Sequence, residues 1–244
     1  MYSDESDPFI EEEQDKEKNY IQLTENIRKE IRSGFIVKVY GIIAYQIVIT
    51  AIVIYLAFVS RKFLYLLLTS KILYYTNLFL IFFLILLPIC APQVYRIVPL
   101  NYIIITLFTF SYSCLIAIFV CFFPLKSIMV ALFLTFLTVV SLSIYAWKSD
   151  RDFTIYGGTL FVSLILLLFS SFILIFLKIP FLNLLYTFIS LIFFCIYLIY
   201  DTQLLIGEGE YKFSEDDYIL AAMRIYLDII IIFLKILQLI GRKD

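Results

Sequence analysis

Six apolar stretches without a single charged residue set the strongest constraint on how this chain folds. Each is at least 21 residues long, and together they cover most of the sequence: 39–60, 72–95, 97–125, 127–147, 153–177 and 179–200. A helix needs about 20 apolar residues to cross a bilayer. Only 16% of the residues are charged and 63% are hydrophobic, whereas soluble domains carry about 25% charged residues. The sequence therefore predicts an all-α integral membrane protein, surrounded by the lipid bilayer.

A seventh segment, 218–240, is also long enough to span but carries Arg224, Asp228 and Lys235. Spacings of four and seven residues place these three charges on one face of a helix. Such a face is costly in contact with lipid. We therefore expect seven transmembrane helices, with the seventh, charge-bearing helix enclosed by the other six. The preceding run Ser214-Glu215-Asp216-Asp217 has the form of a capping box, which predicts Ser214 as the N-cap.

The connections between these helices are short. Basic residues mark most of them, so we expect no inserted soluble domain. Pro88, Pro92 and Pro99 predict that the second helix ends in a kinked or irregular segment.

The first thirty residues differ from the rest. They contain ten acids and four bases, a net charge of -6, whereas the remainder carries +5. High charge with few aromatic residues is typical of disorder. We expect residues 1–30 to form an acidic, disordered, cytosolic tail, followed by a transmembrane domain over residues 31–244. An acidic start does not predict a secretory signal.

Two aspartates are the candidate functional residues. Asp228 lies ten residues into its helix, where a carboxylate costs on the order of 2.5–3.5 kcal/mol and needs a partner or a proton. Asp201 directly follows the sixth stretch, and consecutive helices joined by a short loop are neighbours, so the two carboxyl groups are expected to meet. Two carboxyl groups in contact share a proton, and losing it adds repulsion that can move a helix. The pair is a candidate gate and pH sensor, whose oxygens would also suit a transient calcium ion.

A purely structural alternative stays open. Arg224 precedes Asp228 by four residues and could form an ion pair with it on the same helix, with Asp201 solvated at the interface. In the gate hypothesis, Arg224 is the candidate counter-ion. Lys235 is expected to extend towards the membrane interface, and the acids between 208 and 217 to form a solvated loop.

The absence of histidine and the spacing of the cysteines exclude several functions. The chain has no histidine, which removes histidine-dependent triads and most zinc hydrolase sites. Its four cysteines lie in apolar runs without metal or disulfide spacing, and are expected to be packing residues: Cys90, Cys114, Cys121 and Cys195. No basic stripe indicates a nucleic-acid surface. We therefore expect no enzyme, no cofactor and no nucleic-acid partner.

Several blocks resemble the transmembrane Bax inhibitor motif family. The strongest is 196–207 (Ile-Tyr-Leu-Ile-Tyr-Asp-Thr-Gln-Leu-Leu-Ile-Gly), followed by 213–222 and 226–230 (Tyr-Leu-Asp-Ile-Ile). Three further blocks agree in order: 31–41 with Gln46, 99–102 with Phe108-Thr109, and 152–158. The resemblance covers residues 28–241. Block 108–112 is similar to the lifeguard branch that includes the glutamate-receptor-associated protein.

This resemblance implies a seven-helix fold with the last helix surrounded by the others. It also implies residence in the endoplasmic reticulum, Golgi or other endomembranes, calcium leak from those stores, and suppression of cell death. The family's two pore aspartates fall on Asp201 and Asp228. Two positions depart from the family's pattern: Ile231 stands where asparagine is usual, and Arg224 where a small or apolar residue is usual. Both change the polar surroundings of Asp228, and with them the pH at which the pair titrates.

Two functions from different classes follow. The first is a pH-sensitive calcium leak channel with an anti-apoptotic role, with calcium as the permeant ion and apoptosis regulators or calcium-channel proteins as candidate partners. The second is a non-conducting membrane adaptor that regulates apoptosis or stress signalling, with the acidic tail as its docking segment. A seven-helix receptor is not favoured, because neither the charged-arginine motif after a third helix nor the Asn-Pro motif of the seventh helix is present. An intramembrane aspartyl protease is not favoured either, because its Tyr-Asp and Gly-Leu-Gly-Asp patterns are not both present.

Orientation is weakly encoded. If the N-terminus is cytosolic, as expected, eight basic residues lie on the cytosolic side and seven on the other. Orientation depends on an excess of basic residues in cytosolic loops, so this difference does not fix the topology or the side on which the C-terminus lies.

Overall fold

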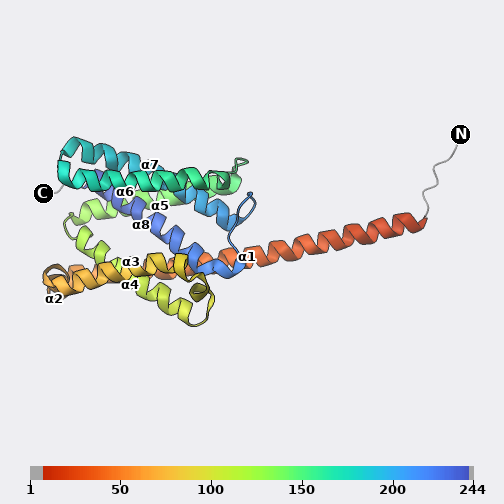
Figure 1. Cartoon of the computed structure of the whole chain (residues 1–244), viewed down its shortest axis with the longest axis horizontal. Helices are drawn as coiled ribbons and strands as arrows, with labels where there is room; N and C mark the ends of the chain where they lie inside the picture. The colour runs from red at the N-terminus through yellow and green to blue at the C-terminus, as the bar shows by residue number, and fades with distance from the viewer. Residues whose placement is uncertain (1–7, 242–244) are drawn as a thin grey trace.

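The computed structural model describes residues 8–241, in which all regular structure is helical (Figure 1). The long helices are α1 (Pro8–Val59), α3 (Lys71–Cys90), α4 (Leu100–Val120), α5 (Leu125–Lys148), α6 (Gly157–Leu177), α7 (Pro180–Ile206) and α8 (Tyr218–Ile240). Short elements connect them: α2 (Arg61–Thr69) and the 3-10 turns η1 (Pro92–Arg96), η2 (Thr154–Tyr156) and η3 (Glu215–Asp217).

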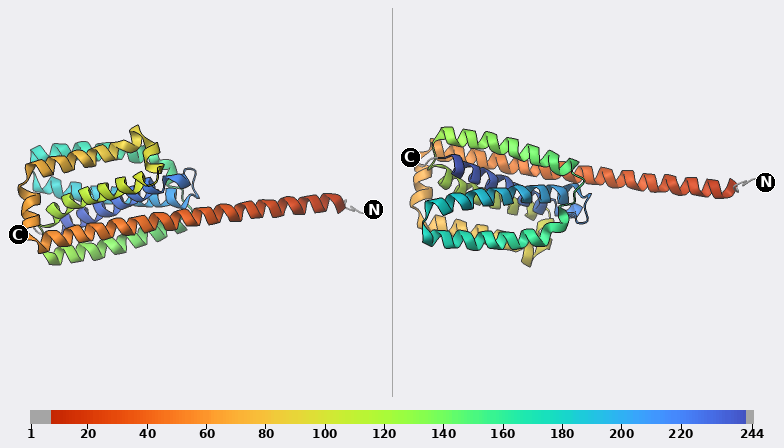
Figure 2. Two further views of the ribbon diagram at one scale, coloured as in Figure 1. Left: turned by 90° about the horizontal axis from the view of Figure 1, so that it is seen from below. Right: turned by 90° about the horizontal axis from the view of Figure 1, so that it is seen from above.

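The long helices run alternately up and down, which gives the bundle two ends. One end, called here the loop end, contains residues 91–99, 149–156 and 207–217; the other, the α2 end, contains α2 and the turns at 121–124 and 178–179. Figure 2 shows α1 continuing far beyond the loop end as a single rod. Helix α8 finishes at the α2 end, where Gly241 lies next to Phe123 (Figure 1).

Six helices are long and apolar enough to cross a membrane on their own: α1, α3, α4, α5, α6 and α7. Their outer faces expose large apolar side chains, such as Phe161, Phe169 and Phe176 on α6, at 62–70%. Surfaces of this kind are stable against lipid rather than water. The prediction of an all-α, multi-pass membrane protein is confirmed in these terms.

Helix α8 is the most deeply buried element. Its side chains at Ile219, Ala222, Tyr226 and Ile232 are fully inaccessible, whereas α6 buries only three residues along its whole length. Helix α8 packs mainly against α7, α1, α5 and α4, while α3 packs outside α4 and α6 packs against α7. The main packing of α8 therefore involves four helices, fewer than the six of the sequence prediction.

The N-terminal segment differs from the sequence prediction. Residues 8–30, expected as part of a disordered tail, form the first turns of α1; residues 1–7 of that tail lie outside the described residues. The segment is rich in glutamate, lysine and glutamine, which have high helix propensity. Glu25 and Lys29 also stand four residues apart, in the favourable order for a helix.

Two connections also differ in detail. The charged break after the first span is itself a helix, α2, whose N-cap Ser60 accepts a hydrogen bond from the backbone N–H of Phe63. As predicted, α3 contains Pro88 and gives way to the irregular segment η1. The predicted capping box is wrong: Ser214 precedes η3 without a side-chain cap, and Asp217 occupies the N-cap position of α8.

Gly207 ends α7, and replacing it should destabilise the protein. Its φ is 76°, and a β-carbon there would lie 2.6 Å from a guanidinium nitrogen of Arg32. A left-handed residue other than glycine costs about 1–2 kcal/mol. Gly207→Ala should therefore lower the thermal unfolding midpoint in detergent, with the displaced arginine adding to the loss.

Gly34→Ala provides the matched control. Gly34 lies within α1, with no atom near the position of an added β-carbon. Alanine is favoured over glycine in a helix by about 0.5–1 kcal/mol, so this change should raise the midpoint. Equal shifts of the unfolding midpoint in the two variants would contradict the requirement for glycine at position 207.

Candidate functional site

The charged face of α8 lies against α7. Arg224 Nη2 is 2.8 Å from Asp201 Oδ1 on α7, and Lys235 Nζ lies 4.6 Å from the centre of the Tyr186 ring, also on α7. Asp228, one turn after Arg224 on α8, lies close enough to Asp201 for the two carboxyl groups to interact. The prediction that these three charges share one helix face is confirmed.

Asp201 lies farther inside the bundle than the sequence indicated. The apolar stretch ends at Tyr200, but α7 continues to Ile206 because residues 201–205 are all buried and extend the packed face of the helix. Asp201 is only 2% exposed. It stands about 7 Å from the end of α7, given a rise of about 1.5 Å per residue.

Arg224 connects this buried carboxylate to the surface. Its side chain is 41% exposed, whereas that of Asp201 is 3% exposed. The guanidinium carbon lies 5.8 Å from the centre of the Tyr200 ring and 5.5 Å from that of Phe213. The arginine therefore covers the carboxyl pair from the loop end. Its partner is Asp201 across the helix interface, not Asp228 in the same helix as the structural alternative required.

Asp228 has fewer partners. It is 5% exposed, and its Oδ2 has no hydrogen-bond partner. The hydroxyl of Thr202, the residue after Asp201 on α7, is also buried without a partner. Since a carboxylate cannot donate, a hydrogen bond between Asp228 and Asp201 requires a proton on one of them. The site thus combines two buried carboxyl groups with one arginine.

A second buried polar cluster lies between α1, α4 and α8. Gln46 donates to Thr109 Oγ1 at 3.0 Å, and Thr50 Oγ1 lies 2.8 Å from the Tyr226 hydroxyl and accepts from Ser113 at 2.9 Å. This cluster was not predicted from the sequence, because all of its residues are uncharged and lie within apolar runs. Their spacing was the available signal: 46 and 50, and likewise 109 and 113, share a helix face.

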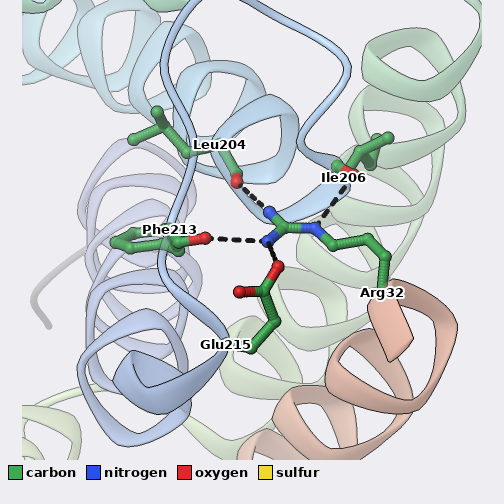
Figure 3. A network of polar contacts seen from close by, with 5 residues as sticks. All are labelled: Arg32, Leu204, Ile206, Phe213 and Glu215. Carbon is green, nitrogen blue, oxygen red and sulfur yellow. Dashed lines mark hydrogen bonds and ion pairs between the residues drawn. The ribbon is translucent and has the colours of Figure 1, made fainter. Parts of the chain in front are cut away.

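Arg32 on α1 binds the end of α7 and the loop that follows (Figure 3). Its guanidinium donates to the carbonyl oxygens of Leu204 at 2.6 Å, Ile206 at 3.1 Å and Phe213 at 2.8 Å. Glu215 Oε1 lies 3.5 Å from the same group. The last carbonyls of a helix have no partner within the helix, and Arg32 satisfies two of them. This role of Arg32 could not be predicted from the sequence, because its partners are backbone carbonyls distant in the chain.

The loop acids are held by nearby groups. Asp217 accepts from Arg96 at 2.8 and 3.0 Å. Asp152 accepts from the hydroxyl of Thr154 at 2.6 Å and from the backbone N–H of Glu210 at 2.8 Å. These hydrogen bonds lower the pKa of Asp152, and the one from the Thr154 hydroxyl has the largest effect. Within residues 8–241, no three Asp, Glu, Cys or His side chains come together as a metal site would require.

A bundle of long apolar helices with a buried carboxyl pair between its last two helices defines a multi-pass helical membrane protein. The sequence family described as inhibitor of apoptosis-promoting Bax1 matches residues 32–244. The chain therefore belongs to the Bax inhibitor family, as the motifs predicted.

Individual relatives agree with this assignment. The chain is 33% identical to human protein lifeguard 3 over 150 residues, which are 57% of this chain and 45% of the relative. It is 34% identical to a BI1-like protein of Arabidopsis thaliana over 151 residues, 59% of this chain and 56% of the relative. Bax inhibitor 1 of Schizosaccharomyces pombe is 29% identical over 145 residues, 59% of this chain and 53% of the relative. The chain spans about half the length of these relatives, and the lifeguard branch stays a prediction.

Proposed function

We propose that this protein is a pH-sensitive calcium leak channel of the endoplasmic reticulum or Golgi membranes that suppresses cell death. In this proposal α8 is the seventh transmembrane helix, enclosed by the others, and the N-terminus is cytosolic. Asp201 and Asp228 form the gate and the proton sensor, and Arg224 is their counter-ion. The Bax inhibitor family description of residues 32–244 supports the role in cell death.

One observation carries the proposal: two buried carboxyl groups meet one arginine at the interface of α7 and α8. Ionisable groups at membrane depth are costly to maintain and mark ion pathways and proton relays by default. Tyr197, Tyr200 and Cys195 on α7 are the other ionisable groups within electrostatic reach of this site. The charged groups of the site are the two carboxyl groups and Arg224, and the proton on the carboxyl pair sets their net charge.

The charge changes by one when that proton leaves. With one shared proton, Asp201, Asp228 and Arg224 sum to zero; without it, the site carries one net negative charge. The second carboxylate repels the first, which favours separation of α7 from α8. Protonation of Asp201 would act on a different contact, because it removes the attraction to Arg224. Loss of the shared proton and protonation of Asp201 each change the packing of the two helices. The direction of the pH response therefore distinguishes whether the carboxyl–carboxyl contact or the Asp201–Arg224 contact holds the gate closed.

The two carboxylates also suit calcium as a permeant ion. Calcium prefers six to eight oxygen ligands, whereas this site offers two carboxyl groups. So few ligands favour brief binding over retention, as passage requires. We propose no resident metal, no cofactor and no enzymatic activity.

Calcium flux in proteoliposomes of purified protein, measured from pH 5 to 8, tests this proposal. We expect flux through the wild-type protein to depend on pH. Asp201→Asn and Asp228→Asn each remove one titrating carboxyl group with almost no change in shape. Either substitution should flatten the pH profile, because a single remaining carboxyl group cannot share a proton.

Asp217→Asn serves as the matched control, since Asp217 is an acid of the loop end that pairs with Arg96. Its pH profile should follow that of the wild type. Flux that depends on pH but is indifferent to both site substitutions would mean that the gate lies elsewhere. Absence of flux above empty liposomes, from folded protein, would exclude the channel.

A second function, the non-conducting adaptor, is favoured by α1. Beyond the bundle this helix exposes five large apolar residues at 50–72%: Tyr20, Ile21, Leu23, Ile27 and Ile31. Spacings of three and four residues place all of them except Ile21 on one helix face. Such a face suits an amphipathic partner helix of an apoptosis regulator or a calcium channel. Tyr20→Ser with Ile27→Ser should abolish cell-death suppression if the adaptor is correct, and leave it intact if the channel acts alone.

A further inference from the structure

The two ends of the bundle differ sharply in charge. No aspartate or glutamate occurs in residues 31–149, 153–200 or 229–241. The described acids therefore lie in the N-terminal part of α1, in the connections of the loop end, and at Asp201 and Asp228. At the α2 end, six basic residues lie in or next to the helix ends: Arg61, Lys62, Lys71, Lys126, Lys178 and Lys235. Among residues 8–241, this end carries only positive charge.

Two of these lysines line a recess of about 370 Å³ between α6, α7 and α8. Its polar lining consists of Ser171, Lys178, Asn183, Tyr186, Lys235 and Gln238. The lining combines two cations with hydroxyl and amide groups and contains no acid. A cavity of this composition attracts an anion with several oxygen atoms.

Lys235 has no anionic partner in the described part of the protein. Its ammonium group lies 4.6 Å from the centre of the Tyr186 ring, and neither Lys235 nor Lys178 pairs with a described acid. A cation over an aromatic ring gains only about 0.5–2 kcal/mol, which does not replace a counter-ion on an apolar helix. Lys235 stands five residues before the end of α8, about 7 Å from it. If α8 spans the membrane, as proposed above, this position places its amine near the depth of the lipid headgroups.

The surroundings of the recess indicate where the anion comes from. Leu174 and Ile175 complete its lining, and the outer face of α6 beside it exposes Phe172 and Phe176 at 60% and 70%. This face is a surface for acyl chains, continuous with the polar recess. Lysine binds phosphate as a point charge. We propose that the recess binds a phosphate-bearing anion through Lys178 and Lys235, and that its occupant is the headgroup of an anionic phospholipid.

Binding of defined lipids to the purified full chain in detergent tests this site. The probes are short-chain phosphatidylglycerol, short-chain phosphatidylcholine and inorganic phosphate, and the readout is the shift in thermal unfolding with probe concentration. We expect wild-type protein to be stabilised by phosphatidylglycerol far more than by phosphatidylcholine. Lys178→Gln with Lys235→Gln should weaken phosphatidylglycerol binding at least about tenfold, the factor that corresponds to ~1.4 kcal/mol.

Lys62→Gln with Lys126→Gln removes the same charge from the same end but outside the recess, and should bind as the wild type does. Lys235→Arg keeps the charge and should retain binding, which separates loss of the site from loss of the fold. Stabilisation by inorganic phosphate that disappears in the recess variant would identify free phosphate as the source of the same anion. Equal weakening by the two double variants would overturn the proposal, since the effect would then be that of a diffuse surface charge.

Discussion

Replacing Arg224 by leucine is expected to be among the most destabilising single changes in this protein. The substitution leaves the Asp201 carboxylate, 3% exposed, without the cation that lies 2.8 Å away. Breaking a fully buried ion pair costs about 3–5 kcal/mol. Because the Arg224 side chain is 41% exposed, we expect a lower value, about 2–3 kcal/mol. The thermal unfolding midpoint in detergent at pH 7.5 should fall accordingly.

A second substitution separates the loss of the cation from the loss of packing. Asp201→Asn in the Arg224→Leu background removes the uncompensated charge and should restore most of the stability. The loss should also shrink in acid, where a proton on Asp201 removes the charge that needs compensation. The alternative result is that the double variant loses as much stability as Arg224→Leu and Asp201→Asn lose together. In that case Arg224 acts through packing on Tyr200 and Phe213, and the ion pair contributes little.

The position of Arg224 also shows where sequence reasoning reaches its limit. The spacing of Arg224, Asp228 and Lys235 correctly predicted a shared face, because helix periodicity depends only on the backbone. It could not choose between Asp228 and Asp201 as the partner of Arg224. That choice depends on how α7 and α8 are aligned along their length, and α7 extends six residues beyond the apolar stretch that marked its end.

The same limit applies to other residues. The six charge-free stretches correctly predicted the apolar helices, because the cost of burying charge in lipid keeps charged residues out of such helices. No sequence pattern indicates the contacts of Arg32, because its partners are backbone carbonyls 172–181 positions away. The prediction of disorder for residues 8–30 was wrong, because it was based on their high charge alone. Their high helix propensity favours the helix α1 that the structure shows.

Arg32 and Arg224 are connected through Phe213. The backbone carbonyl of Phe213 accepts from Arg32, and its ring lies 5.5 Å from the Arg224 guanidinium. The backbone N–H of Phe213 also donates to the carbonyl of Leu204 at 3.1 Å, which Arg32 binds as well. The end of α7, the loop and the cover of the carboxyl pair are thus fixed together from α1.

Arg32→Ala should therefore destabilise both the fold and the covered site. It leaves the carbonyls of Ile206 and Phe213 without this donor in a partly buried place, and weakens the bonding at Leu204. Each such hydrogen bond to a charged group contributes about 1.5–3 kcal/mol, and water will replace part of it, so we expect a net loss of about 2–4 kcal/mol. Thermal unfolding in detergent measures the loss, and hydrogen exchange at the amides of residues 204–217 should speed up ahead of the rest of the bundle.

Arg28→Ala is the control, one turn earlier on the same helix and exposed, and it should leave both readouts unchanged. Arg32→Lys keeps the charge but cannot reach three carbonyl oxygens at once, since lysine presents a single nitrogen where arginine presents a planar fork. Its stability should fall between alanine and wild type. If the stability of Arg32→Lys instead equals that of the wild type, Arg32 contributes only through its charge near Glu215. The loop would then be fixed by the contacts of Arg96 and Asp152 and not by Arg32 of α1.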